Sequence, residues 1–244
     1  MKAVILLAGL GNRLQPLTLT TPKSLLPIGN SNTLEHMIRK LIKHDVSSFV
    51  IVCGHMQKEI QNYLEHTFPL LNLTIVTNDY YRTTNTGYSL MLAKEYLQDE
   101  TFIKLDGDVI FQEEIIKKLV AAEDGLSYVC VDSTAVDEEV IKVQCGADGN
   151  VTRIGNKLPV AGAVGESIGI ERIGKRSSAA LFEMLEKMME NSDNYQNYYE
   201  VAYDAIIQAG EPFKALDITG LHWVEIDTLD DYKLAQHYFS HADA

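Results

Sequence analysis

Two cations near the amino terminus have the spacing to hold a polyphosphate. Arg13 and Lys23 precede Glu35, the first acidic residue, in a chain of 244 residues whose formal net charge is −13. Gly9 and Gly11 stand just ahead of Arg13 and allow backbone N–H groups to approach a ligand closely. A cationic, glycine-turned loop after a strand suits the phosphates of a nucleotide. We therefore predict a nucleotide site in this loop.

The glycines alone have a simpler explanation, a tight strand-to-helix turn without a ligand. The dinucleotide-binding fingerprint fails because Leu14 stands where its third glycine belongs. The P-loop pattern fails as well, because no lysine follows a glycine at the required spacing. Pro22 restricts the backbone beside Lys23, so the ammonium group is presented from a stiffened loop.

Carboxylates at the ends of two later strands could bind a metal ion. Asp106 and Asp108 end one apolar run, and Asp227 ends another. At the carboxyl edge of a parallel sheet these groups would face the crevice of the glycine loop. Mg²⁺ prefers one or two carboxylates together with phosphate oxygens and water, so we predict a magnesium site at Asp108 and Asp227. Asp106 and Glu225 are expected around the ion. The alternative for each aspartate is a helix cap, and for Asp227 this reading is serious.

These residues need a scaffold of strands that alternate with helices. Apolar runs of strand length occupy 3–7, 49–53, 73–76 and 102–105, and helical spacing follows at 34–42, 58–64 and 88–97. The alternation predicts an α/β fold with a doubly wound, largely parallel but mixed central sheet. Strand-like segments at 128–131, 141–144 and 151–154 follow, with Asp148 and Gly149 as a hairpin turn. We expect a single domain over 1–244 with an acceptor-side elaboration at about 130–210.

Composition limits the partners. An acidic chain without a basic stripe does not suit a nucleic acid or an anionic membrane surface. The apolar run after Lys2 is too short for a signal peptide and lacks a cleavage site. Cys53, Cys130 and Cys145 are odd in number and lack a CxxC spacing, which predicts free thiols in the cytoplasm. A monomer and a homodimer both remain open.

Four segments resemble one enzyme family. LLAGLGNRLQPLTLTTPKSLLPI (6–28) is similar to the signature of nucleotidyltransferases that activate sugar phosphates and related phosphoesters. Within that superfamily NDYYRTTNTGYSL (78–90), LDGDV (105–109) and WVEIDTLDDY (223–232) most resemble the cytidylyltransferases that act on phosphocholine and on phosphonates. The resemblance implies a Rossmann-like nucleotidyltransferase fold and transfer of CMP from CTP to a small acceptor, with release of pyrophosphate.

The resemblance also assigns roles to residues. It implies that Asp108 and Asp227 hold the catalytic Mg²⁺, while Lys23 offsets charge at the reacting phosphate and Arg13 holds the departing pyrophosphate. It implies that the nucleotide lies against the glycine turn and the segment ending at Gly87, a set comprising Leu7, Ala8, Gly9, Gly11, Arg13, Lys23, Asn85, Gly87 and Asp106. Asn85 can donate to and accept from a pyrimidine edge. The alternative is that Asn85 and Gly87 simply begin the next helix.

The acceptor side is less sharply defined. Lys157 falls where family members place a lysine against the acceptor phosphate, with a solvated lysine as the alternative. Glu166 with the aromatic residues Tyr199 and Trp223 would suit a cationic head such as choline or an aminoalkyl group. Aromatic residues at helical spacing more often belong to the core.

Three other functions stay open at this point. The first is a sugar- or polyol-phosphate nucleotidyltransferase that uses UTP, dTTP or CTP. The second is a nucleotide-binding regulator without turnover. The third is a Rossmann dehydrogenase, which the missing third glycine disfavours.

Overall fold

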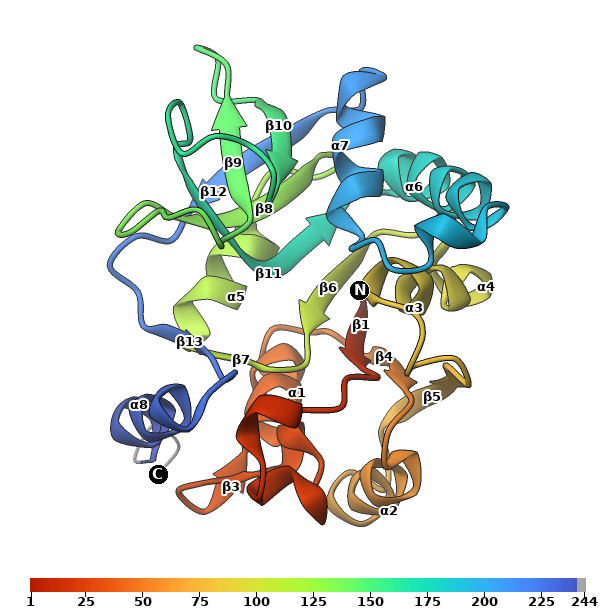
Figure 1. Cartoon of the computed structure of the whole chain (residues 1–244), viewed down its shortest axis with the longest axis vertical. Coiled ribbons are helices and arrows are strands. Elements are labelled where there is room, and N and C mark those ends of the chain that lie inside the picture. Colours follow the sequence, from red (N-terminus) through yellow and green to blue (C-terminus); the bar gives the residue numbers. More distant parts are fainter. Residues whose placement is uncertain (241–244) are drawn as a thin grey trace.

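The computed structural model describes residues 1–240 and is organised around a nine-stranded mixed sheet (Figure 1). One half of the sheet is parallel, in the order β5-β4-β1-β6, with bounds β1 Lys2–Leu7, β4 Ser48–Cys53, β5 Asn72–Thr77 and β6 Phe102–Asp106. Strand β1 lies between β4 and β6. The loop that leaves β1 therefore starts at the middle of the carboxyl edge.

The other half of the sheet is largely antiparallel. Strand β11 pairs with β6, β8 and β9, while β10 pairs with β9 and β12 runs parallel to β8. Their bounds are β8 Ser127–Asp132, β9 Lys142–Cys145, β10 Val151–Gly155, β11 Gly165–Ile173 and β12 Phe213–Asp217. The predicted hairpin turn is present between β9 and β10, where Gly149 has a φ of +76°. The expected mixed, doubly wound sheet is confirmed.

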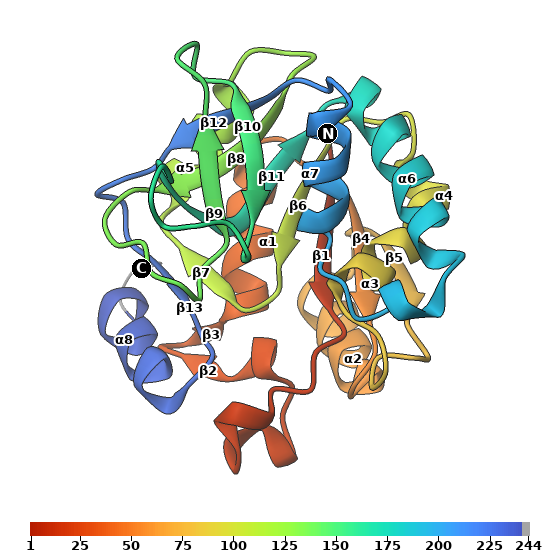
Figure 2. The same cartoon turned by 45° about the horizontal axis from the view of Figure 1, so that its top comes forward.

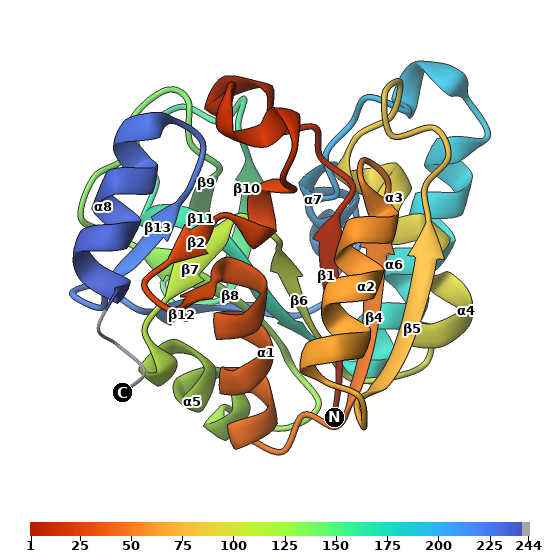
Figure 3. The ribbon, with the colours of Figure 1, turned by 90° about the horizontal axis from the view of Figure 1, so that it is seen from below.

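Helices cover both faces of the sheet (Figure 3). Residues of β1 alternate between the two cores, with Ala3, Ile5 and Leu7 on one side and Val4 and Leu6 on the other. The first core includes α1 Thr33–Lys43, α2 Gln57–Thr67 and α5 Glu113–Ala121. The second includes α3 Thr86–Leu92, α4 Lys94–Leu97, α6 Lys175–Met189 and α7 Glu200–Gln208.

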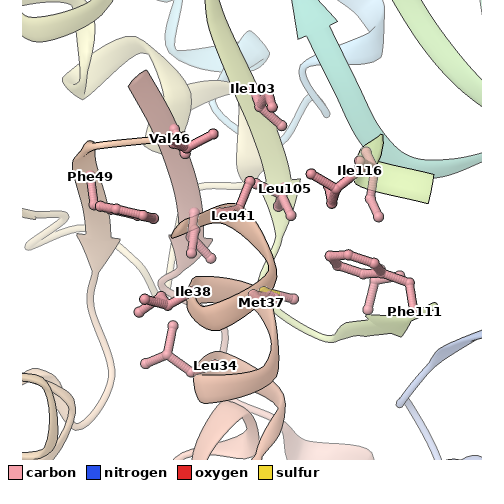
Figure 4. Close-up of a cluster of buried hydrophobic side chains, with 14 of the residues drawn as sticks. Leu34, Met37, Ile38, Leu41, Val46, Phe49, Ile103, Leu105, Phe111 and Ile116 are labelled. Atoms are coloured by element: carbon pink, nitrogen blue, oxygen red, sulfur yellow. The ribbon is translucent and has the colours of Figure 1, made fainter. Parts of the chain in front are cut away.

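Helix α1 packs its apolar stripe against the sheet. Figure 4 shows Leu34, Met37, Ile38 and Leu41 directed toward side chains of β4, β6, β7 and α5, among them Phe49. Each of these α1 side chains is fully buried, and burial of one such side chain stabilises the fold by about 1.5–3 kcal/mol. The side-chain carbonyl oxygen of Asn32 caps the helix by accepting from the Glu35 amide at 3.0 Å. The stripe fixes α1 directly behind the loop that follows β1.

A small antiparallel ladder joins two segments that are distant in the sequence. Strands β7 Val109–Phe111 and β13 Trp223–Glu225 pair with each other, and the Ile226 amide donates to the Asp108 carbonyl at 2.9 Å. Helix α8 Leu229–Phe239 follows β13 and shares a third core with Leu14, Leu26 and Ile28 of the amino-terminal loop. Short strands β2 Pro27–Ile28 and β3 Ser31–Asn32 complete that region. The ladder brings the segments of Asp108 and Asp227 together.

Some local expectations needed correction. The helix expected over 88–97 is divided at Ala93 into α3 and α4, and α5 was not expected. Strand β7 was also missed, because three apolar residues after an aspartate read as a continuation of the loop. Across residues 1–240, the helices are all too short or too polar to cross a membrane.

Candidate active site

The loop after β1 is tied down at several points. Gly11 has a left-handed φ of +65°, and the Thr18 hydroxyl donates to the Gly11 carbonyl at 2.7 Å. Leu14 is fully buried in the third core. Figure 2 shows the loop (red) leaving β1 and passing toward the side of α8. Arg13 and Lys23 therefore stand on an ordered segment that faces the β7–β13 ladder.

The two loop cations meet the two predicted aspartates. The Lys23 ammonium donates to Asp108 Oδ2 at 2.8 Å and to Asp227 Oδ1 at 2.6 Å. The Arg13 guanidinium donates to the other carboxylate oxygen of Asp227. Burial alone would lower the pKa of Lys23, but the charges of Asp108 and Asp227 outweigh it and raise that pKa. Residues more than 200 positions apart thus form one charged cluster.

Asp227 is free for this cluster because its neighbour caps the helix. The Thr228 hydroxyl accepts from the Asp231 amide, and the Asp231 side chain accepts from the Thr228 amide at 2.7 Å, which forms a capping box. The alternative role of Asp227 as the cap of α8 is thereby taken by Thr228. Its carboxylate points to Lys23 and Arg13 instead.

The donor set suits a divalent cation. One carboxylate oxygen from each of Asp108, Glu225 and Asp227 can be chosen so that all three lie within 4.8 Å of one another. Partial desolvation by the surrounding atoms and the like charges of Asp108 and Asp227 raise the pKa of Glu225 to about 8, although the residue is exposed at the surface. Three carboxylates face two cations here, and oxygen ligands of this kind are those that Mg²⁺ prefers. Glu225 is thus closer to the candidate metal position than the sequence indicated.

A cleft of about 580 Å³ opens beside this cluster. Ten of the predicted residues line it: Ala8, Gly9, Arg13, Asn85, Asp106, Asp108, Glu166, Tyr199, Glu225 and Asp227. A Cβ added at Gly9 would meet nothing within 4 Å, so the backbone here borders open space. Leu7, Gly11, Lys23, Gly87, Lys157 and Trp223 are outside the lining. Lys23 is nonetheless bonded to two lining residues.

Asn85 lies both at the cleft and at the start of a helix. It lines the cleft, and its Oδ1 accepts from the Thr86 amide at 2.8 Å at the start of α3. Gly87 is small for a different reason, since an added Cβ would lie 2.8 Å from the Asn197 carbonyl oxygen. The glycine therefore allows α3 to approach the segment before α7 rather than to approach the cleft.

The four residues predicted to bind the acceptor do not lie together: two line the cleft and two lie outside it. Glu166 lines the cleft, and Lys157 is exposed outside it. The Tyr199 hydroxyl donates to Asp106 Oδ2 at 2.6 Å. The Trp223 indole donates to Asp132 Oδ2 at 2.7 Å. Burial and the carboxylates of Asp132 and Asp137 raise the pKa of Glu166 to about 7.

A buried lysine behind the cleft was missed by the sequence reading. The Lys104 ammonium, fully buried in β6, lies 3.1 Å from Asp106 Oδ2 and 3.0 Å from Glu171 Oε2. It also lies 3.5 Å from the centre of the Tyr199 ring. Its neighbours Asp106 and Glu171 outweigh burial and raise the pKa of Lys104. The available signal was a lysine inside the apolar strand FIKL.

Comparisons with known proteins agree with this geometry. Residues 2–159 match the nucleotidyl transferase family. CMP-5'-(3-aminopropyl)phosphonate synthase of Streptomyces rubellomurinus is 29% identical over 98% of this chain, which spans only 39% of that protein. CTP:phosphoglutamine cytidylyltransferase of Campylobacter jejuni is 25% identical over 96% of this chain and 98% of its own length.

A solved structure has the same fold over nearly the whole chain. CTP:phosphocholine cytidylyltransferase of Streptococcus pneumoniae aligns with a TM-score of 0.78 and 22% identity, covering 97% of both chains. The match to the family extends from β1 through β10 and includes the loop that carries Arg13 and Lys23. The chain therefore belongs to the nucleotidyl transferase family.

Proposed function

We propose that the protein is a CTP-dependent cytidylyltransferase that transfers CMP to a small phosphate or phosphonate acceptor and releases pyrophosphate. The observation that carries this proposal is the convergence of Lys23 and Arg13 with Asp108 and Asp227 at one end of the cleft. Two relatives aligned over nearly the full chain, one named for CTP and one for a CMP-linked product, support the choice of nucleotide.

In this reaction an acceptor oxygen attacks the α-phosphorus of CTP. The new P–O bond forms as the bond to the bridging oxygen of the β-phosphate breaks, and pyrophosphate leaves with the electron pair. Acceptor phosphate oxygens are ionised near neutral pH, so the reaction needs no general base. Catalysis then depends on positioning and on neutralisation of charge.

The two cations of the loop would provide most of this positioning and charge neutralisation. Lys23 would stabilise negative charge that builds up at the α-phosphate, and Arg13 would hold the departing pyrophosphate. Asp108 and Asp227, with Glu225 beside them, would hold Mg²⁺, which supplies charge neutralisation to the phosphate oxygens. Gly9 and Asn85 would border the base and ribose, since both line the cleft next to β1 and α3.

The cytoplasm is the proposed location. Cys53 and Cys130 are free and buried, and burial raises the pKa of Cys53 to about 12, which suits inert thiols in a reducing compartment. A homodimer remains a prediction, which sedimentation velocity measurements of the purified protein would check.

Pyrophosphate release tests the activity. CTP, UTP, dTTP and ATP would each be combined with phosphoethanolamine, phosphocholine, an aminoalkyl phosphonate and glucose 1-phosphate, with Mg²⁺ present. We expect turnover with CTP and an alkyl phosphate or phosphonate. Turnover restricted to UTP or dTTP with the sugar phosphate would establish a sugar nucleotidyltransferase instead. Nucleotide binding without turnover in any combination would favour a regulator.

A further inference from the structure

Charge divides the cleft into two ends. The first end contains Asp108, Glu225 and Asp227 with the cations Lys23 and Arg13. The second end contains the carboxylates of Asp137, Glu139 and Glu166, which come from the loop after β8 and from β11. Among the lining residues of the described chain, Arg13 is the only basic one. A lysine lies next to this end: Lys142 is opposite Glu166 in the β9–β11 ladder. Its ammonium donates to the backbone carbonyls of Asp137, Glu138 and Val140, and the carboxylates of the second end have no ion pair of their own within residues 1–240.

Glu166 is the carboxylate of this end that lies on the central sheet. It stands opposite Asp132 in the β8–β11 ladder, where Thr134 and Trp223 donate to the Asp132 carboxylate. The side-chain carboxylate of Glu166 has no hydrogen-bond or ion-pair partner within residues 1–240, and burial together with its like-charged neighbours raises its pKa to about 7. A carboxylate held in this state is a candidate for contact with a positively charged ligand.

A second carboxylate that lines the cleft, next to Lys104 and Asp106, also has an unpartnered oxygen. Glu200 lines the cleft, is only 5% exposed, and its Oε2 has no hydrogen-bond partner in the described chain. Asp106 presents one buried oxygen, Oδ1, in the same condition. Buried acceptors without donors are rare in folded proteins. Groups rich in N–H would satisfy them.

The aromatic residues at this end do not form a cage. Tyr199 and Tyr203 are 1% and 0% exposed, and the Lys104 ammonium already lies over the Tyr199 ring at 3.5 Å. Trp223 is bonded to Asp132 and lies outside the lining. Tyr198 is the one tyrosine from the segment before α7 that combines cleft lining with substantial exposure, at 44%. Most of the aromatic residues that the sequence suggested for this site are therefore buried in the core and cannot contact a ligand with their ring faces.

We propose that the second end of the cleft binds a primary ammonium group of the acceptor through Glu166, with Asp137 and Glu139 around it. A primary ammonium group donates three hydrogen bonds, which carboxylates accept. A quaternary ammonium group donates none and is recognised mainly by aromatic faces. The preferred acceptor is then a small phosphate or phosphonate with a primary amine, not its trimethylated form and not a neutral sugar phosphate. This inference rests on the proposed function.

Three matched acceptors test the inference. Phosphoethanolamine, phosphocholine and propyl phosphate share a short alkyl phosphate and differ in the group at its far end. With CTP and Mg²⁺, we expect kcat/KM for phosphoethanolamine to exceed that for the other two by roughly 10-fold or more, the effect of one charge-assisted hydrogen bond. Equal use of propyl phosphate, or a preference for phosphocholine, would contradict the inference.

The variant Glu166→Gln separates recognition from catalysis. It should lower kcat/KM for phosphoethanolamine by roughly 10-fold through KM, and leave the value for propyl phosphate within about twofold. Glu183→Gln removes the same charge from an exposed position on α6 and should change neither value. If Glu166→Gln slows both acceptors equally, the residue has no role in amine recognition and the inference is wrong.

Calorimetry distinguishes this inference from the proposed function. Binding of each acceptor would be measured to protein saturated with a non-hydrolysable CTP analogue. Tighter binding of phosphoethanolamine than of propyl phosphate, lost in Glu166→Gln, supports the amine site even if no acceptor is turned over, in which case only the proposed function fails. Equal binding of the two acceptors overturns the amine site even where CMP transfer to other acceptors is observed.

Discussion

Lys23 bridges two carboxylates, one just before β7 and one just after β13, and the same carboxylates are the proposed metal ligands. Each cation of the loop therefore contacts a carboxylate that would hold the ion, so nucleotide, ion and loop would meet at one place in the proposed reaction. Changing a single atom here should lower turnover strongly while changing the stability of the fold little. The most direct variant is the isosteric one.

Asp108→Asn keeps the shape of the side chain and one oxygen that can accept from Lys23, but removes the negative charge. We expect kcat to fall by roughly 100-fold or more, because charge at the phosphates is then poorly neutralised. The thermal midpoint should change little. Asp230→Asn, on the exposed side of α8, is the control and should retain wild-type turnover. Full turnover in Asp108→Asn would remove the metal assignment.

Lys104 gives a prediction about stability. Lys104→Met leaves Asp106 and Glu171 without their cation in a buried setting, and loss of one partner from such a pair destabilises by about 3–5 kcal/mol. Urea unfolding measures this loss. The double variant with Glu171→Gln should recover part of it, because one of the unpaired charges is then gone. Lys117→Met, at an exposed pair with Glu114 on α5, should have an effect below about 1 kcal/mol.

Glu166 should make stability depend on pH. Its folded pKa of about 7 is above the ordinary value of 4.5, so the folded protein holds this proton more tightly than the unfolded chain does. The contribution of Glu166 to the free energy of unfolding therefore falls as pH rises from about 4.5 to about 7. Glu166→Gln should be more stable than wild type at pH 8, by on the order of 1 kcal/mol after allowance for solvent screening, and this advantage should vanish near pH 4.5. Parallel stability curves for the two proteins across this range would contradict the assigned environment.

At the scale of elements, the capping box of α8 holds Asp227 in place. Thr228→Ala removes the cap and should destabilise by about 1 kcal/mol. Because the Asp227 amide also donates to Asp231, kcat should fall as well. Thr228→Ser retains the hydroxyl and should restore both the thermal midpoint and kcat. A loss of stability with unchanged kcat would mean that Asp227 is positioned by Lys23 and Arg13 alone.

Elements with a strong repeat were predictable, and elements defined by long-range contacts were not. The stripe from Leu34 to Leu41 indicated α1, and the apolar runs of β1, β4 and β6 indicated a parallel sheet. Strand β7 was missed because its three residues become a strand only by pairing with β13, over 100 residues later. Lys157 and Trp223 could not be placed, since the orientation of a side chain near a hairpin or a short strand depends on tertiary packing.

The same limit applies inside the site. Arg13, Lys23, Asp108 and Asp227 could be grouped because strand ends in such sheets share one edge. Glu200 and Lys104 could not be assigned to the site from the sequence. Both are buried next to Asp106, and no local sequence pattern predicts that burial. Tyr199 fitted a helical repeat that either a core or a ligand site explains, and most of its surface is in the core.

At the scale of the whole molecule, we propose a single domain with an acceptor-side elaboration at about 130–210. Both main cores extend across the parallel and antiparallel halves of the sheet, so neither half has a core of its own. Urea unfolding should then be one cooperative transition. Fluorescence of Trp223, the only tryptophan, and far-UV circular dichroism should give the same midpoint. Two separated midpoints would show that the elaboration unfolds independently.

The Lys23 bridge has a thermodynamic consequence for the order of assembly. An ion that takes oxygens of Asp108 and Asp227 competes with an ammonium group already seated between them. Its affinity for the vacant protein is reduced by the free energy of the contacts it must displace. A triphosphate would offer Lys23 replacement oxygens and would bring its own ion, so the exchange would become favourable for the two together. The proposed site would then bind metal and nucleotide jointly and discriminate against free metal.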